Sequence, residues 1–319
     1  MKLSWVKALG GFFLAAVLSA PAFGAPNTAL PGTLNFVEGQ ASIQNQSLTS
    51  KSVGSTELDA GQTITTTDGR AEVLLTPGVF LRLDHNTAVK MISPSITDTQ
   101  VEVDKGRAEV EVAELHKQNN IQIREDGLNT RLVKTGLYDF SADENQVRVF
   151  KGEAHVVDGD NDIKIKGGHQ LILNAGNLKS VKFDQKADEN DFYNWSGLRS
   201  EYLSEANVNA ATLYVGNAWA GPGWYWDPWF SAYTFIPGDG FLYSPFGGWG
   251  FYSPGWAFYA PAYYGYGFRG YGYRPVFHPH PGVGFGHGHD HFVGPHGGAA
   301  MMSHGFHGGG GFHGGGFHR

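Results

Sequence analysis

The chain has 319 residues, a formal net charge of -7 and no cysteine. The lack of cysteine excludes disulfides and thiolate chemistry, so a metal site would need histidine, carboxylate or backbone oxygen ligands. The negative charge argues against nucleic acid as a partner. Because the 46 glycines gather towards the last third and most charged residues precede Asn209, we expect a core in the first two thirds.

The start of the chain has the pattern of a secretory signal peptide. A basic start is followed by an apolar run over residues 8–20, and small side chains precede a cut between Gly24 and Ala25. This run is shorter than the roughly 18 to 20 apolar residues that span a bilayer, which favours cleavage over an uncleaved anchor. We expect residues 1–24 to be removed, residues 25–35 to form a linker, and the mature chain to be exported to the periplasm or cell surface without a transmembrane segment.

Short alternating segments fill residues 36–187 and predict strands. The pentapeptide Gly-Arg-Ala-Glu-Val occurs at residues 69–73 and 106–110, and looser copies stand at residues 37–43 and 151–156. In each copy glycine allows a tight turn or bulge, and the following apolar and polar side chains alternate so that one face is buried. We therefore predict an all-β domain of short strands, either an antiparallel rolled sheet or a sandwich.

The spacing of these segments resembles the FecR domain. The matching elements are Leu58-x-x-Gly61-Gln62-x-Ile64-x-Thr66, Gly69-Arg70-Ala71, Leu81-x-Leu83, Lys105-Gly106-Arg107-Ala108, Lys134–Phe140 and Val147–Gly152. In FecR proteins a periplasmic domain receives a signal from an outer-membrane receptor, and a cytoplasmic segment controls a sigma factor. The resemblance implies a β-rich periplasmic module for protein contacts and transfers no catalytic residue. Because residues 1–7 leave no room for a sigma-binding segment, we do not expect direct control of transcription.

A helical period follows the strands and predicts one amphipathic helix over residues 188–209. The residues that recur every three or four positions are Phe192, Trp195, Leu198 or Arg199, and Tyr202. We expect this helix to dock on the sheet and close the domain, so that deletion of residues 208–319 would leave a folded domain. A partner-binding helix is the alternative.

Residues 210–275 combine tryptophan, tyrosine and phenylalanine with dense glycine and proline. Glycine and proline at this density prevent long regular elements, so we expect largely irregular turns laid against the β domain. Exposed rings favour self-association, and stacking on surface glycans is the alternative.

Residues 276–319 form a glycine- and histidine-rich, low-complexity tail that we predict to be disordered. Its candidate metal ligands are His278, His280, His287, His289, Asp290 and His291. Neutral imidazoles bind Zn, Ni or Cu ions, and a glycine-rich chain can wrap around them. Because rigid histidine spacing is absent, a spacer without a bound cofactor is favoured over a physiological metal site.

The remaining polar residues predict no catalysis, since neither a nucleophile elbow nor a His-Glu-x-x-His motif occurs. Isolated histidines are expected at strand surfaces without a role: these are His85, His116, His155 and His169. Acids two positions apart are expected on solvated strand faces: these are Glu102 with Asp104 and Glu109 with Glu111. We therefore predict a non-enzymatic interaction or structural protein whose partners are envelope proteins or further copies of itself. The alternative is divalent-metal binding or iron-related envelope sensing through the histidine tail.

Overall fold

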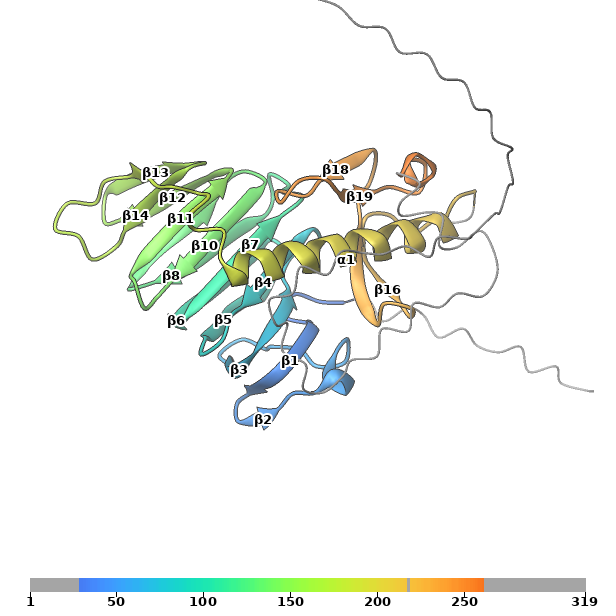
Figure 1. The fold of residues 1–319 in the computed structure, drawn as a ribbon, viewed down its shortest axis with the longest axis horizontal. Coiled ribbons are helices and arrows are strands. Elements are labelled where there is room, and N and C mark those ends of the chain that lie inside the picture. Colours follow the sequence, from blue (N-terminus) through green and yellow to red (C-terminus); the bar gives the residue numbers. More distant parts are fainter. Residues whose placement is uncertain (1–28, 217–218, 261–319) are drawn as a thin grey trace, which may run out of the picture. The chain divides into compact units, whose positions relative to one another are not determined.

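A computed structural model describes residues 29–216 and 219–260 of the chain. These residues form one large sheet, one α-helix, two short hairpins and two 3-10 turns (Figure 1). The predicted signal peptide with its cut between Gly24 and Ala25 lies outside the described residues. So do the tail residues from 261 onward and the six predicted metal ligands within them.

The main sheet contains 15 strands of the described residues. They are β1 (Leu34–Ile43), β2 (Gln46–Ser47), β3 (Thr63–Leu74), β4 (Val79–Leu83), β5 (Ala88–Ser95), β6 (Asp98–Lys105), β7 (Arg107–Val112), β8 (Asn120–Glu125), β9 (Leu128–Leu132), β10 (Gly136–Ser141), β11 (Gln146–Lys151), β12 (Glu153–Asp158), β13 (Asn161–Lys166), β14 (His169–Ile172) and β15 (Val181–Lys182). The 3-10 turn η1 (Ser50–Ser52) follows β2.

The strand order is β13-β12-β9-β8-β6-β5-β3-β4-β7-β10-β11-β14-β15, with β1 paired to β2 and β3. All described neighbours in this sheet are antiparallel except β6 and β8, which run parallel. Strand β13 also lies against β11 and β14, so the sheet bends back on itself (Figure 1). The prediction of an all-β fold of short strands is confirmed.

The first copy of the pentapeptide begins where β3 comes close to β1. Gly69 on β3 lies opposite Gly39 on β1, next to a bulge in the pairing. A Cβ atom on Gly69 would lie 2.3 Å from the Glu38 carbonyl oxygen, and Gly39 itself has a φ of 62°. A larger residue at either position would force the two strands apart.

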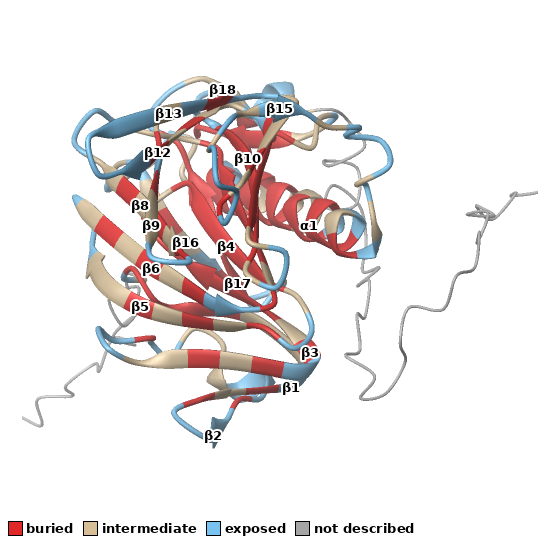
Figure 2. Ribbon diagram, turned by 90° about the vertical axis from the view of Figure 1, so that its left-hand side faces the viewer, coloured by how far each residue is buried: buried red, intermediate tan, exposed pale blue. Residues whose placement is uncertain are grey.

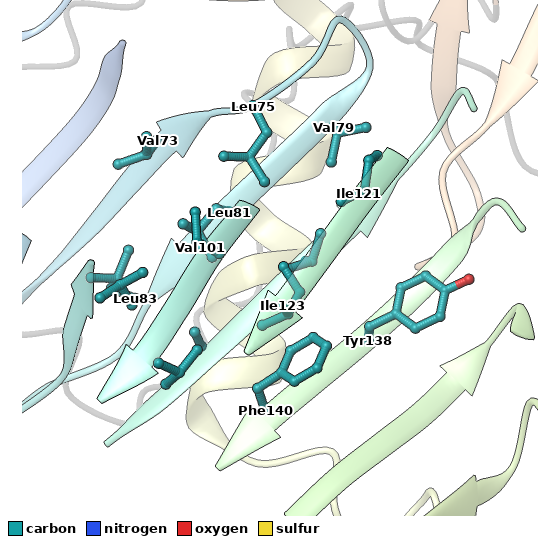
Figure 3. Close-up of a cluster of buried hydrophobic side chains, with 14 of the residues drawn as sticks. Val73, Leu75, Val79, Leu81, Leu83, Val101, Ile121, Ile123, Tyr138 and Phe140 are labelled. Atoms are coloured by element: carbon teal, nitrogen blue, oxygen red, sulfur yellow. The ribbon is translucent and has the colours of Figure 1, made fainter. Parts of the chain in front are cut away.

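One face of the sheet encloses the main apolar core. Val73, Leu81, Val101, Ile123 and Phe140 point into it from different strands (Figure 3). The strands at one side, such as β6, alternate buried with half-buried side chains, as expected for a sheet with one wet face. The central strands β4 and β10 are instead buried at every position (Figure 2). A second layer must therefore cover the other face of these central strands.

The helix α1 (Asp191–Leu213) supplies part of that second layer. It begins three residues later than the predicted range 188–209, because the Asn190 side chain caps it by accepting from the backbone N–H groups of Phe192 and Tyr193. It ends four residues later than predicted, at Leu213. Of the two alternatives for the buried position, Arg199 is buried and Leu198 is half exposed. None of the described helices is long and apolar enough to cross a membrane.

Two hairpins complete the second layer, where mostly irregular turns were expected. They are β16 (Gly223–Asp227) with β17 (Ala232–Ile236), and β18 (Phe241–Tyr243) with β19 (Gly250–Tyr252), followed by the 3-10 turn η2 (Ala257–Tyr259). Trp224, Phe235 and Phe251 pack with Phe80 of β4 and Leu203 of α1 in a second apolar cluster. The rings form strands here because the second face of the sheet offers them a surface on which to pack, which a local count of glycine and proline does not reveal.

Candidate functional site: a buried ionic layer

A row of charged side chains crosses the central strands on the face that α1 covers. Direct cross-strand partners along this row are Glu72 with Arg82, Arg82 with Glu109, Glu109 with Asp139, and Asp139 with Arg148. Each of the five is buried. Together with three neighbours they form what we call the ionic layer, which comprises Glu72, Arg82, Arg107, Glu109, Glu111, Asp139, Arg148 and Arg199.

Arg82 is the centre of the first half of the layer. Its Nε lies 2.8 Å from Glu72 Oε2 and its Nη2 lies 2.8 Å from Glu111 Oε2, and all three side chains are fully buried. Arg199 of α1 adds an ion pair of 2.9 Å to Glu72 Oε1. Burial alone would raise the pKa of Glu72, but the Arg199 and Arg82 guanidinium groups together hold that pKa below its usual value.

The Asn35 side chain joins Glu72 to a segment that lies 198 residues after Asn35 in the chain. The Asn35 side chain donates to Glu72 Oε1 at 2.9 Å and to the backbone oxygen of Tyr233 at 3.0 Å. Its Oδ1 accepts from the Tyr233 N–H at 2.7 Å. Because Asn35 lies on β1 and Tyr233 on β17, this buried amide fixes the first strand of the sheet to the first hairpin.

Asp139 is the centre of the second half. Its two oxygens lie 2.6 Å from Arg107 Nε and 3.0 Å from Arg148 Nη1. Arg148 extends the network towards the surface with an ion pair of 2.6 Å to Glu144. Burial still raises the pKa of Asp139, although the two guanidinium groups oppose that rise.

Glu109 lies between the two halves without a hydrogen bond to either carboxylate oxygen. Burial, and then the neighbouring Asp139 carboxylate, raise the pKa of Glu109 to about 8, while Ser196, Arg107 and Arg82 lower it in part. The side chain is therefore protonated at neutral pH. Neutralisation removes much of the desolvation cost that an unpaired buried charge would carry.

The helix meets this layer with its polar side. Ser200 Oγ donates to Glu111 Oε1 at 2.7 Å, and Ser244 from the second hairpin donates to the same oxygen at 2.9 Å. Two turns further along, Asn207 donates to the backbone oxygens of Phe235 and Tyr252 at 2.7 and 3.0 Å. The helix thus binds the sheet and both hairpins through side-chain hydrogen bonds as well as through apolar contacts.

The expectation of a solvated face was therefore wrong for Glu109 and Glu111, which are both fully buried. Glu102 is half-buried and Asp104 is exposed, in keeping with a wet outer face. The difference arises because β7 lies in the middle of the sheet under α1, whereas β6 has no such cover. The sequence does contain arginines at buried positions of other central strands, Arg82 on β4 and Arg148 on β11, but it does not show which acids they face.

The isolated histidines lie apart from the ionic layer. His85 and His116 are exposed to solvent, with side chains near Asp68 and Glu114. His155 lies on β12, where its Nδ1 is 2.6 Å from Asp162 Oδ1. Within residues 29–216 and 219–260, no group of three or more histidine, aspartate or glutamate side chains is arranged to hold a metal ion.

Two surface hollows lie away from the ionic layer. One, of about 340 Å³, is lined by Gln40, Thr67, Asp68, His85 and Asn86. The other, of about 570 Å³, has acidic side chains in its wall, among them Asp126, Asp158 and Asp162. Neither hollow is lined by a residue of the ionic layer, so neither gives access to it. Its geometry is that of an internal scaffold.

An all-β domain with one face closed by a helix is the class that this architecture defines. Residues 62–188 match the family model described as FecR protein. This match over 127 of the 319 residues confirms the resemblance to the FecR domain that the sequence motifs predicted. The match runs from the residue before β3 to shortly before α1, and it includes seven of the eight members of the ionic layer, all except Arg199.

Two solved structures resemble part of the chain. Both are crystal structures of a protein assigned as an anti-sigma factor from Parabacteroides distasonis ATCC 8503, with sequence identities of 17% and 16%. Each has a TM-score of 0.34, and each match covers 43% of this chain and 64% of the other chain. The chain thus spans less than two thirds of those proteins. No curated protein matches the chain.

Proposed function

We propose that the chain is a non-enzymatic protein-interaction protein of the periplasm or cell surface, in which the FecR domain is a rigid docking module and the tail is an assembly segment. The ionic layer is the observation that carries this proposal. Its acids and guanidinium groups pair mainly with one another under α1, so they hold a scaffold together and leave no charged group poised over a substrate. The match to the FecR family supports a regulatory or sensing role for this module.

The boundary between the two parts lies further along the chain than residue 207. Ala211 of α1, together with Ile236 and Tyr252 from the hairpins, forms a third apolar cluster. A chain ending at Asn207 would leave Phe80 without the rings that cover it and Glu111 without Ser244. We therefore include residues 208–260 in the proposed docking module, whereas the sequence alone led us to expect that the domain folds without them.

Envelope association of the full chain tests this proposal. The chain is expressed in its host with an epitope tag, and a tail variant carries serine at every tyrosine and phenylalanine of residues 261–277. We expect the unchanged chain to fractionate with the envelope and the variant to be released into the soluble fraction with an unchanged circular dichroism spectrum. Equal association of both chains would show that the tail is not the assembly segment.

The docking role of the FecR domain needs a separate measurement. Cross-linking in intact cells, followed by mass spectrometry of the purified full chain, would locate contacts to other envelope proteins. We expect cross-links from exposed lysines of the FecR domain, such as Lys117 and Lys164, to a defined partner. Cross-links confined to the tail would contradict the docking role.

Metal binding through the tail is the second candidate, and it is favoured by six potential ligands within residues 278–291. Isothermal titration of the full chain with Zn, Ni or Cu ions, in the presence of free histidine as a competitor, measures whether the affinity is physiological. A matched variant carries asparagine at the five histidines and at Asp290. Selective binding of one metal that is lost in the variant would support this function, and indiscriminate binding abolished by histidine would refute it.

A further inference from the structure

Four exposed aromatic rings lie on β18 and around η2, two segments that contribute Phe241 and Ala257 to the third apolar cluster. The side chains of Tyr243, Trp256, Phe258 and Tyr259 have exposed fractions of 74%, 47%, 61% and 75%. We call these four residues the ring patch. Contiguous apolar surface on a soluble protein is usually covered by something, whereas scattered apolar residues need no explanation.

The four rings belong to one local structure. Phe241 links the hairpin side of the patch to the third apolar cluster, with ring centroids 4.3 Å from Tyr243 and 4.2 Å from Tyr252. On the other side, Ala257 of η2 is buried in that same cluster. Trp256 and Tyr259 flank Ala257 with ring centroids 5.6 Å apart. A hairpin and a 3-10 turn that are both anchored in one core therefore hold the patch.

The sequence around the ring patch carries no charged side chains. Residues 240–268 include no lysine, arginine, aspartate or glutamate. An anionic or cationic ligand would thus find no ionic partner in this stretch. An aromatic or glycine-rich peptide can instead contact the rings through offset stacking and edge-to-face packing.

The chain itself supplies such a peptide directly beyond the patch. The last described residue is Ala260, one residue after Tyr259. Residues 261–277 then carry five tyrosines, two phenylalanines and two arginines, with glycines between them. The arginines add the possibility of cation–π contacts to exposed rings.

We propose that the ring patch binds residues 261–277 of the same chain. At roughly 3.3 Å per extended residue, this segment is long enough to fold back over the patch from Ala260. A short flexible connection gives an effective concentration in the millimolar range, so weak ring contacts suffice within one chain. The contact involves the same rings as the proposed assembly role of the tail, but it is measured in the purified chain without envelope, so either proposal can fail without the other.

Disulfide trapping tests the proposal, and the absence of native cysteine makes an introduced pair unambiguous. Gly255→Cys lies beside Trp256 at an exposed position where an added Cβ meets no atom within 4 Å. Gly270→Cys places the second thiol in the middle of the segment. Both substitutions leave every ring of the patch and of the segment in place.

The effective concentration of the pair is measured in the full chain from its equilibrium with glutathione. We expect it to be at least tenfold higher than in a matched chain whose five tyrosines and two phenylalanines in residues 261–277 are serine. Tenfold corresponds to about 1.4 kcal/mol of contact free energy. Tyr243→Ser with Tyr259→Ser should lower it similarly, whereas Leu198→Ser, at an exposed apolar position of α1 outside the patch, should not.

Two outcomes would overturn the proposal. Equal effective concentrations with and without the rings of the segment would show that tethering alone brings the thiols together. Disulfides that join two chains, seen as a covalent dimer, would assign the patch to a second copy instead.

Discussion

Glu72 and Glu109 occupy the same position in two identical Gly-Arg-Ala-Glu-Val pentapeptides, and both are Cα partners of Arg82 across the sheet. Both are fully buried. Yet the pKa of Glu72 lies below its usual value, whereas that of Glu109 is raised to about 8. The cause is the neighbourhood, because Glu72 receives Arg82, Arg199 and Asn35, while Glu109 has Asp139 beside it and no ion pair of its own.

Glu109→Gln should therefore weaken the pH dependence of stability. The folded state keeps the Glu109 proton up to about pH 8, whereas the unfolded state releases it near 4.5. Because the folded state binds more protons between these values, the free energy of unfolding falls as pH rises through this window. Glutamine removes this contribution, which amounts to roughly 5 kcal/mol at full ionisation. Urea unfolding at pH 5, 7 and 9 measures it, and the variant should gain most at pH 9.

Glu72→Gln is the matched control in the sister pentapeptide, and it should have the opposite sign. The folded-state pKa of Glu72 is depressed, so its ion pairs contribute stability above the unfolded pKa that is lost as pH falls through the folded pKa. This variant should be destabilised at pH 7 by about 3 kcal/mol. Equal effects of the two substitutions at every pH would contradict the assignment of opposite pKa shifts.

Arg82→Met should be strongly destabilising, by about 3–5 kcal/mol, because it leaves Glu111 and part of Glu72 buried without their cation. The control is Arg70→Met, which removes a partly exposed pair with Asp84 and should cost about 1 kcal/mol or less. Adding Glu111→Gln to Arg82→Met should restore part of the loss. Chemical denaturation of the three variants measures these differences, and the absence of any recovery in the double variant would argue against a direct Arg82–Glu111 coupling.

Asn207→Ala should loosen both hairpins at once. The Asn207 side chain donates to backbone oxygens of β17 and β19 and accepts from the Tyr252 N–H at 2.7 Å. Leaving these buried groups unpaired should cost roughly 2–4 kcal/mol. Near-ultraviolet circular dichroism, which reports on Trp224 and its neighbours, should lose intensity before the far-ultraviolet signal does. Asn194→Ala, on the exposed side of the same helix, should change neither.

A chain ending at Asn207 should fail to unfold cooperatively, whereas one ending at Ala260 should retain a single transition. The reason is that the rings of residues 219–260 cover Phe80 and Leu203 on the second face of the sheet. Differential scanning calorimetry of the two truncated chains measures this difference. A sharp transition in the shorter chain would show that α1 and the sheet suffice.

The strands and the main core were predictable because alternation is a local property. Val101, Val103, Ile121 and Ile123 alternate with polar residues in the sequence and point into the core in the structure. The burial of Glu109 was not predictable in the same way, since it depends on a helix more than 80 residues later. The candidate metal ligands in the tail remain a prediction, because they lie outside the described residues.

The two hairpins were also not predictable from the local sequence pattern. Their rings are separated by prolines and glycines that locally indicate turns, and Asp227 does form one by accepting from the N–H groups of Trp229 and Phe230. What makes strands of the flanking residues is a surface supplied by β4 and α1. Periodicity within the segment contains no information about that surface.

The contact between Asn35 and Tyr233 sets the order in which the chain can mature. A polypeptide emerges from the ribosome, or from a translocation channel, with its N-terminus first. Asn35 must wait for a partner 198 residues later before its amide and Glu72 are satisfied. Long-range closure of this kind is slow relative to local contacts. The second face of the sheet is therefore completed only after the hairpin residues have been synthesised.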